Sequence, residues 1–136
     1  MNRILIVDDT KSWILFHTET IEQLYGDIFS ITVAESATEA LNIIKHNIDN
    51  PFDVIITDLQ MENDFEPLNA GEWLIEQINT FSSYKNTQIV IISAMYNIEM
   101  IAKKYNVECL SKTLLIRNKL LLKFMFEKIM PFLTKM

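Results

Sequence analysis

Five short runs of aliphatic and β-branched residues recur along the chain, and segments long enough for helices separate them. The runs cover residues 4–7, 29–34, 54–57, 89–92 and 107–110. Their length and composition predict β-strands. Three of the runs lack polar alternation, as expected of strands that are covered on both faces. The sequence therefore predicts a buried parallel sheet.

Helix signals fill the segments between these runs. An apolar stripe begins at Trp13 and ends before Gly26, a residue suited to the C-terminus of a helix. One last helix is predicted over residues 114–129, with Pro131 near its end. Three further helices are expected to begin at capping residues. These residues are Ser36, Asn69 and Asn97.

The alternation amounts to five βα units. Right-handed crossovers between parallel strands place helices on both faces of a sheet. We therefore expect an α/β fold with a doubly wound five-stranded parallel sheet, in the order 2-1-3-4-5 of the flavodoxin-like (βα)5 type. A length of 136 residues fits one such domain, so residues 1–136 are predicted to form it with nothing left for a second domain.

Charge and composition exclude several classes of protein. A net charge of −6 without a basic stripe argues against binding nucleic acid. No stretch approaches the ~20 apolar residues of a membrane span, and the first apolar run stops at Val7 before two acids, unlike a signal peptide. One cysteine excludes an internal disulfide and suits a reducing compartment. We expect a cytoplasmic protein that contacts neither nucleic acid nor membrane.

Reactive side chains follow four of the predicted strands. Asp8 and Asp9 follow the first strand, Asp58 the third, Ser93 the fourth and Lys112 the fifth. In the predicted order these strand ends share one edge of the sheet. A carboxylate pair at the end of a buried strand is costly unless a cation offsets it. Three carboxylates suit Mg²⁺, while a hydroxyl and an ammonium can bind an anion.

With these motifs the chain resembles the response regulator receiver domain of two-component signalling. The resemblance covers residues 3–133. It rests on four motifs that follow the correct strands in the correct order. They are Asp8-Asp9, Asp58, Ser93-Ala94 and Lys112.

The resemblance implies that Asp58 is the phosphoryl acceptor. It also implies that Mg²⁺ is bound directly by Asp9, Asp58 and the backbone carbonyl of Gln60, while Asp8 acts largely through water. Phosphoryl transfer depends mainly on positioning and charge neutralisation, so the physics favours the same roles.

Further implied roles concern the phosphate. Lys112 would pair with Asp58 and then with its phosphate, and the hydroxyl of Ser93, next to Ala94, would move to a phosphoryl oxygen. Gln60 and Met95 occupy positions that tune hydrolysis in the family, and apolar Met95 offers no help in positioning water.

The implied protein is a single-domain response regulator without an output domain. Its partners would be a histidine kinase or histidine phosphotransfer protein and a downstream protein, reached by phosphorylation-dependent binding or by phosphorelay. It would not be an enzyme for free metabolites, and would at most phosphorylate and dephosphorylate itself.

Three departures from the family concern the output. The loop after Asp58 takes thirteen residues to reach Gly71, and Glu62 stands where the family usually has a proline. The extra acids of this loop, Glu62, Asp64 and Glu66, are expected near the metal. Thr113 replaces a proline that is often cis, so a trans bond is expected. Cys109 replaces the switch aromatic, and is better explained as a small buried residue than as a redox site.

Three alternatives remain open. A degenerate receiver could act as a phosphorylation-independent interaction module. A Mg²⁺-dependent aspartate-nucleophile phosphatase would need a second acid two residues after its nucleophile, where Gln60 and Thr10 stand instead. A flavin-binding sheet would need an uncharged phosphate loop where the acid pair lies.

Two other features have both structural and functional interpretations. Ile116, Leu120 and Phe124 form a second apolar stripe on the last helix, which together with the preceding helix is either a docking or homodimer surface or simply an apolar exterior. His17 lies on the apolar side of the first helix and is expected to be packed, whereas His46 is expected to face water.

Overall fold

The computed structural model describes residues 2–64 and 66–133, so residues 1 and 134–136 of the predicted domain lie outside it. Within this part of the chain, five strands form one parallel sheet in the order β2-β1-β3-β4-β5. The predicted strand order and fold class are confirmed. The strands are β1 (Asn2–Val7), β2 (Phe29–Ala34), β3 (Val54–Thr57), β4 (Gln88–Ser93) and β5 (Glu108–Ser111).

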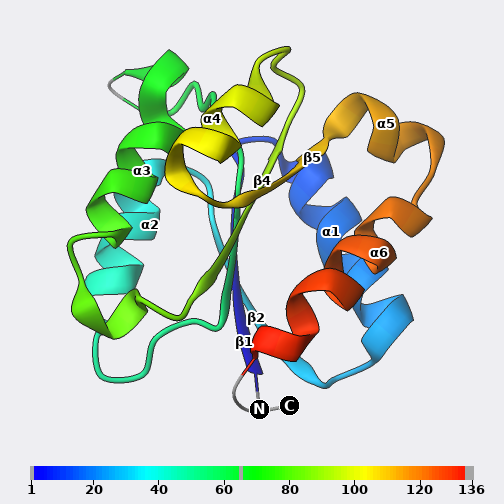
Figure 1. Cartoon of the computed structure of the whole chain (residues 1–136), viewed down its shortest axis with the longest axis horizontal. Coiled ribbons are helices and arrows are strands. Elements are labelled where there is room, and N and C mark those ends of the chain that lie inside the picture. Colours follow the sequence, from blue (N-terminus) through cyan, green and yellow to red (C-terminus); the bar gives the residue numbers. More distant parts are fainter. Residues whose placement is uncertain (1, 65, 134–136) are drawn as a thin grey trace.

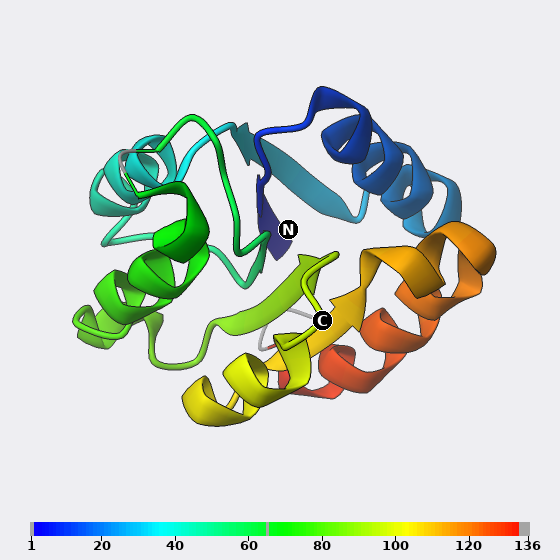
Figure 2. The same ribbon diagram turned by 90° about the horizontal axis from the view of Figure 1, so that it is seen from above.

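Helices cover both faces of the sheet, which runs between the two layers in Figure 1 and Figure 2. One layer contains α2 (Ala37–Lys45), α3 (Ala70–Ile78) and α4 (Ile98–Tyr105). The other layer contains α1 (Lys11–Tyr25), α5 (Lys112–Arg117) and α6 (Leu120–Ile129). Three short 3-10 helices complete the elements, η1 (Pro67–Asn69), η2 (Ser82–Tyr84) and η3 (Met130–Phe132).

Alternate residues of the central strands supply two hydrophobic cores. Leu5 and Val7 of β1 pack toward the layer of α2, α3 and α4, whereas Ile4 and Ile6 pack toward the layer of α1, α5 and α6. Successive side chains of a strand point to opposite faces, so a run without polar residues is buried on both sides. The two cores hold the strand ends, and the side chains that follow them, in fixed positions.

Two predicted helix ends are confirmed. The Ser36 hydroxyl accepts a hydrogen bond from the amide of Glu39 at 3.0 Å, as an N-cap serine does. At the end of α1, Gly26 adopts φ 62° and its N–H donates to the carbonyl of Glu22 at 2.8 Å. A positive φ at this position favours glycine, which explains the residue type.

The two predicted asparagine caps are confirmed in position, because Asn69 and Asn97 directly precede α3 and α4, but the side-chain cap bonds expected of them are wrong. The Asn69 side chain makes no cap bond, and Asn69 is itself the last residue of η1, which leads directly into α3. Asn97 stands at the N-cap of α4 without a side-chain cap bond, and its Oδ1 is buried without a hydrogen-bond partner in the described part of the chain. A favourable residue type does not by itself orient the side chain toward the helix.

The predicted single helix over residues 114–129 is also wrong, because the chain breaks into α5 and α6. Asn118 is extended at the break, with φ −149° and ψ 98°. Its side-chain oxygen accepts a hydrogen bond from the amide of Leu120 at 3.1 Å, where α6 begins. Asparagine side chains compete with helical backbone bonds in this way. Because α5 begins at Lys112, this lysine is the first residue of a helix.

Two further expectations concern the backbone and the membrane. No cis peptide bond occurs among residues 2–64 and 66–133, so the expected trans link before Thr113 is confirmed. None of the helices described here combines the length and the apolar character that crossing a membrane requires.

Candidate functional site

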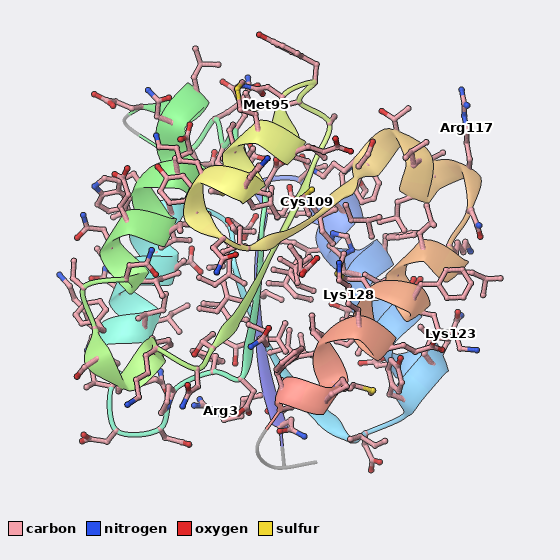
Figure 3. All side chains as sticks on the ribbon, in the orientation of Figure 1. Arg3, Met95, Cys109, Arg117, Lys123 and Lys128 are labelled. Carbon is pink, nitrogen blue, oxygen red and sulfur yellow. The ribbon has the colours of Figure 1, made fainter. Side chains whose placement is uncertain are left out.

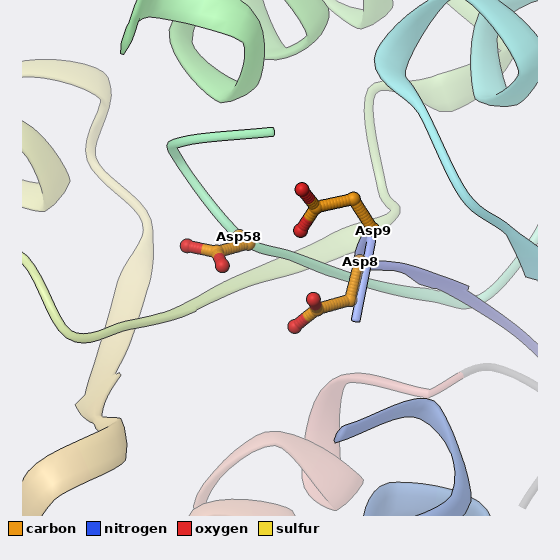
Figure 4. A group of neighbouring side chains, drawn as sticks. All are labelled: Asp8, Asp9 and Asp58. Atoms are coloured by element: carbon orange, nitrogen blue, oxygen red, sulfur yellow. The ribbon is translucent and has the colours of Figure 1, made fainter. Parts of the chain in front are cut away.

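Three carboxylates meet at the carboxyl edge of the sheet, as the strand order requires. Asp8 and Asp9 follow β1 directly, and Asp58 follows the neighbouring strand β3, so the two segments deliver their acids side by side (Figure 4). One carboxylate oxygen from each acid lies within 4.8 Å of the others. Side chains separated by fifty residues in the sequence therefore form one cluster.

Lys112 joins two of these acids from the start of α5. Its Nζ lies 2.7 Å from Oδ2 of Asp58 and 2.8 Å from Oδ2 of Asp8. The lysine is 6% exposed and Asp8 is 1% exposed, so these charges interact with little screening by water. The predicted convergence of Asp8, Asp58 and Lys112 is confirmed.

Burial and charge shift the pKa values of this pair. Burial raises the pKa of Asp8 above its ordinary value, although the hydrogen bond and charge of Lys112 act in the opposite direction. Burial alone would lower the pKa of Lys112, but the nearby carboxylates of Asp58 and Asp8 outweigh it and raise that pKa. The lysine is therefore held as a cation at neutral pH.

The loop after β3 closes over the second acid. The amide of Glu62 donates to Oδ2 of Asp9 at 2.8 Å, and the Gln60 side-chain amide donates to the Glu62 carboxylate at 3.1 Å. The backbone N–H of Glu62 therefore contacts the acid cluster. A proline at this position, as the family usually has, would have no N–H to donate. The departure in sequence creates a contact that fixes the orientation of Asp9.

Asp58 is fixed by its own strand end and by α3. The amide of Leu59 donates to Asp58 Oδ1 at 2.7 Å. Gly71, at the start of α3, lies against the same peptide, and a Cβ at position 71 would lie 2.2 Å from the carbonyl oxygen of Asp58. Glycine at this position therefore allows the helix to approach the backbone of the acid.

An open pocket lies above the cluster. Ser93 is buried at its edge, and its hydroxyl accepts a hydrogen bond from the amide of Met95 at 3.3 Å. Met95 lies at the site end of the molecule and Arg3 at the opposite end (Figure 3). The predicted residues from three strand ends and the loop after β3 thus share one cavity. The lining residues are Asp9, Thr10, Asp58, Gln60, Glu62, Ser93, Ala94 and Met95.

Cys109 lies outside this pocket, on β5 opposite Ile91. It is half-buried and packs against the core formed with α2, α3 and α4. Burial raises the pKa of its thiol, and the charges of Glu99 and Glu108 raise it further. A raised pKa disfavours the reactive thiolate, so the packing interpretation is better supported than a redox role.

Asp64, one of the added acids in the loop, caps another helix. Its carboxylate accepts hydrogen bonds from the amides of Ala37 and Thr38, at 2.8 and 3.1 Å, and from the Thr38 hydroxyl. Negative charge is favourable at the N-terminus of a helix, here α2. Both oxygens of Asp64 are therefore engaged in anchoring the loop.

The two histidines lie as predicted. His17 is 1% exposed and its ring packs against Trp13 and Phe16, at 5.6 and 5.7 Å between centroids. Burial lowers the pKa of His17 to about 4, and the charge of Lys112 acts in the same direction. His46 is exposed. The His17 ring is therefore a neutral packing group at physiological pH.

Ile116, Leu120 and Phe124 are exposed, as the second apolar stripe predicts. Their exposed fractions are 70%, 51% and 52%. The break at Asn118 divides them, with one residue on α5 and two on α6. We refer to these three residues as the outer patch.

Sequence reasoning missed two residues next to the site. The sequence pattern places Trp13 only in a core stripe, yet its ring lies 4.9 Å from Lys112 Nζ. Gly71 marks only the end of the loop in the sequence, yet it packs on the Asp58 backbone. No local signal in the sequence pairs Trp13 with Lys112, because this contact joins the start of α1 to the start of α5.

The acid cluster fits a divalent cation. Three carboxylates face one buried ammonium, so an excess of negative charge remains at the site. Oxygen ligands at this spacing suit Mg²⁺, which prefers carboxylates and retains several waters. The adjoining pocket leaves room for those waters.

The family is decided by comparison with known domains. Residues 4–118 match the model of the response regulator receiver domain, a range that includes all three acids and Lys112. The chain is a member of the response regulator receiver family. Receiver domains are signalling proteins of two-component systems, and phosphorylation and Mg²⁺ binding are general features of the family.

Solved receiver domains share this fold. The signal receiver domain of a DNA binding response regulator protein from Colwellia psychrerythraea is 19% identical, with a TM-score of 0.76 over 96% of this chain and 99% of its own. The Francisella response regulator 1452 receiver domain is 25% identical, with a TM-score of 0.61 over 92% of this chain and 99% of its own. The chemotaxis response regulator CheY4 of Vibrio cholerae is 23% identical, with a TM-score of 0.66 over 82% of this chain and 87% of its own. Comparison with curated protein sequences gives no match.

Proposed function

We propose that this receiver domain accepts a phosphoryl group on Asp58, from a histidine kinase or a histidine phosphotransfer protein, in a reaction that requires Mg²⁺. The observation that supports it best is the buried Lys112 ammonium between Asp58 and Asp8, at 2.7 and 2.8 Å. Phosphoryl transfer needs positioning and charge neutralisation more than other help from the protein. A fixed cation at the acceptor meets part of that need.

In the proposed step, a carboxylate oxygen of Asp58 attacks the phosphorus of a phosphohistidine. A P–O bond forms while the P–N bond breaks, and the leaving imidazole takes up a proton. Asp9, Asp58 and the Gln60 carbonyl would hold Mg²⁺ directly, with Asp8 acting through water. Bound Mg²⁺ would supply positive charge to the phosphoryl oxygens.

Two residues of the chain would then bind the new phosphate. Lys112 would turn from the carboxylate to a phosphoryl oxygen, which carries more negative charge. The Ser93 hydroxyl accepts a hydrogen bond from the amide of Met95, so its own proton can be donated to a second phosphoryl oxygen. Ala94, beside it, lines the same pocket and would move with it.

The lifetime of the phosphorylated state would depend on the residues around the pocket. Gln60 and Met95 both line it. Met95 has no group that can orient an attacking water, so slow hydrolysis is proposed. The modified domain would signal by binding a downstream protein or by passing the phosphoryl group on, and the outer patch is the proposed docking or dimer surface.

Acyl-phosphate labelling tests this function. With acetyl phosphate and MgCl₂ the protein should gain a mass of about 80 Da on Asp58, which peptide mass spectrometry would locate. Asp58→Asn should abolish the adduct, and so should EDTA. Asp49→Asn is the matched control, because it makes the same change at an exposed position before β3. If the wild type gains no adduct, the phosphorylation-independent module is favoured.

A further inference from the structure

The ammonium of Lys112 has one side that no acid occupies. An ammonium carries three donors, and Lys112 directs two hydrogen bonds to Asp58 and Asp8. A further contact of the ammonium is the face of the Trp13 ring, with 4.9 Å between Nζ and the ring centroid. Because Lys112 is only 6% exposed, water does little to solvate this side. The indole therefore completes the surroundings of a buried cation.

The Trp13 ring is itself held in place. Trp13 lies in the first turn of α1, and its amide donates to the carbonyl of Thr10 at 3.0 Å. Phe16 packs edge-on against the ring, with 5.3 Å between centroids, and His17 lies at 5.6 Å. These two neighbours fix the plane of the indole beside the lysine.

The ring stack next to Lys112 is also uncharged. His17 is buried behind Trp13, and its Nδ1 has no hydrogen-bond partner among residues 2–64 and 66–133. A protonated His17 would repel the lysine, but the ring is neutral at physiological pH. The cation consequently faces acids on one side and a neutral aromatic group on the other.

We propose that Trp13 is a positioning residue for phosphoryl transfer, because its ring holds the Lys112 ammonium between Asp8 and Asp58. This inference rests on the function proposed above. A π face attracts a cation without the directional lone pairs of an oxygen acceptor. Lys112 can therefore turn from the carboxylate toward the phosphoryl oxygens and keep the contact. A third acid at this place would compete with the phosphate for the same ammonium.

A graded substitution series tests the proposal. The phosphorylation rate with acetyl phosphate and MgCl₂ should fall in the order Trp13, Trp13→Tyr, Trp13→Phe, Trp13→Leu, by about tenfold in total, since cation–π attraction weakens in that order and a buried contact is worth about one power of ten. The rate should follow the aromatic character of the side chain, whereas a purely structural role would change thermal stability and leave the rate of the folded protein unchanged. Trp73→Leu on α3 is the matched control and should keep the wild-type rate.

Fluorescence supplies a second measurement that does not depend on the Leu variant folding. The chain has two tryptophans, so Trp73→Phe leaves Trp13 as the single indole. Its emission should change on addition of acetyl phosphate and MgCl₂, with the same rate constant as the mass adduct, because Lys112 moves against its ring. An adduct that forms without any change in emission would overturn the proposal.

The outcomes separate this inference from the proposed function. A wild type that gains no phosphoryl group overturns both. A wild type that is phosphorylated at the same rate as Trp13→Phe and Trp13→Leu overturns the role of Trp13 alone.

Discussion

The acid cluster and the outer patch both reverse the usual distribution of side chains, in opposite directions. At the cluster, Lys112 and Asp8 are charged and buried, with exposed fractions of 6% and 1%. On the outer patch, Ile116 is apolar and 70% exposed. Charged residues are rarely buried without a partner, and large apolar patches are rarely left exposed, so each region departs from one of these rules.

The two regions differ in how the reversal is compensated. Each buried charge of the cluster has a partner within the chain, because Lys112 bonds to Asp58 and Asp8, and Asp8 also accepts from the Thr10 amide at 2.9 Å. The exposed side chains of the outer patch have no comparable cover in the described part of the chain. The comparison indicates that the buried charges are compensated within the chain, whereas cover for the outer patch depends on the docking or dimer contact proposed above.

The largest effect is expected when the internal compensation is removed. Lys112→Met should lower the free energy of unfolding by about 3 kcal/mol at neutral pH in EDTA, because it leaves two buried carboxylates without their cation. Urea denaturation measures this loss. Lys128→Met is the control, since its pair with Glu108 is solvent-exposed and should contribute little. Equal losses in the two variants would contradict the contrast between buried and exposed charge.

A smaller effect is expected from His17, the neutral group beside the cluster. The pKa of its ring is about 4 in the folded protein and 6.5 in the reference state, so the unfolded chain binds a proton that the folded chain refuses. Folding stability should therefore fall as pH is lowered from about 7 to about 5, with a contribution of about 2 kcal/mol from this residue.

Paired denaturation curves at the two pH values measure this contribution. His17→Leu should lose it, whereas His46→Leu, at an exposed position, should keep the wild-type pH dependence. If His17→Leu and the wild type respond equally to pH, the neutral packed ring is disproved.

The smallest effect on stability is expected at the outer patch. The triple variant Ile116→Gln, Leu120→Gln, Phe124→Gln should change the free energy of unfolding by less than about 1 kcal/mol, because exposed positions contribute little and glutamine is a good helix former. It should nevertheless abolish self-association or partner binding, measured by light scattering and titration calorimetry.

A charged triple on the same surface provides the control for the outer patch. Lys119→Gln, Lys123→Gln, Glu127→Gln alters neighbouring exposed side chains and should retain the association. Unchanged mass and unchanged partner binding in the apolar triple would show that the outer patch is only an apolar exterior.

The sheet and the charged site could be predicted because both depend on short, local patterns. Runs such as residues 54–57 define strands by themselves, and the connection rules then fix the strand order. Once the order is known, Asp8 and Asp58 must follow the neighbouring strands β1 and β3, and Lys112 must follow β5 at the same edge of the sheet. The convergence of the site follows from topology, although the individual hydrogen bonds do not.

The features that could not be predicted depend on contacts between distant segments. Leu115 and Leu122 both face the core, so the apolar pattern continues across the break at Asn118 and conceals it. The cap that Asp64 provides to α2 joins residues 27 positions apart. The contact of Trp13 with Lys112 is equally non-local, because it joins α1 to α5. The apolar stripe of α1 does not distinguish residues that face the core from residues that face the site.

The long loop after β3 leaves and rejoins the molecule at neighbouring points. Its path departs after Leu59 and returns at Gly71, whose N–H donates to the Leu59 carbonyl at 2.9 Å. A loop that is closed at its base by this hydrogen bond can gain or lose residues without moving Asp58. Variation in the part of the loop beyond Glu62 should consequently change which proteins approach Asp58, whereas changes at Gln60 and Glu62, which line the pocket, would reach the site itself.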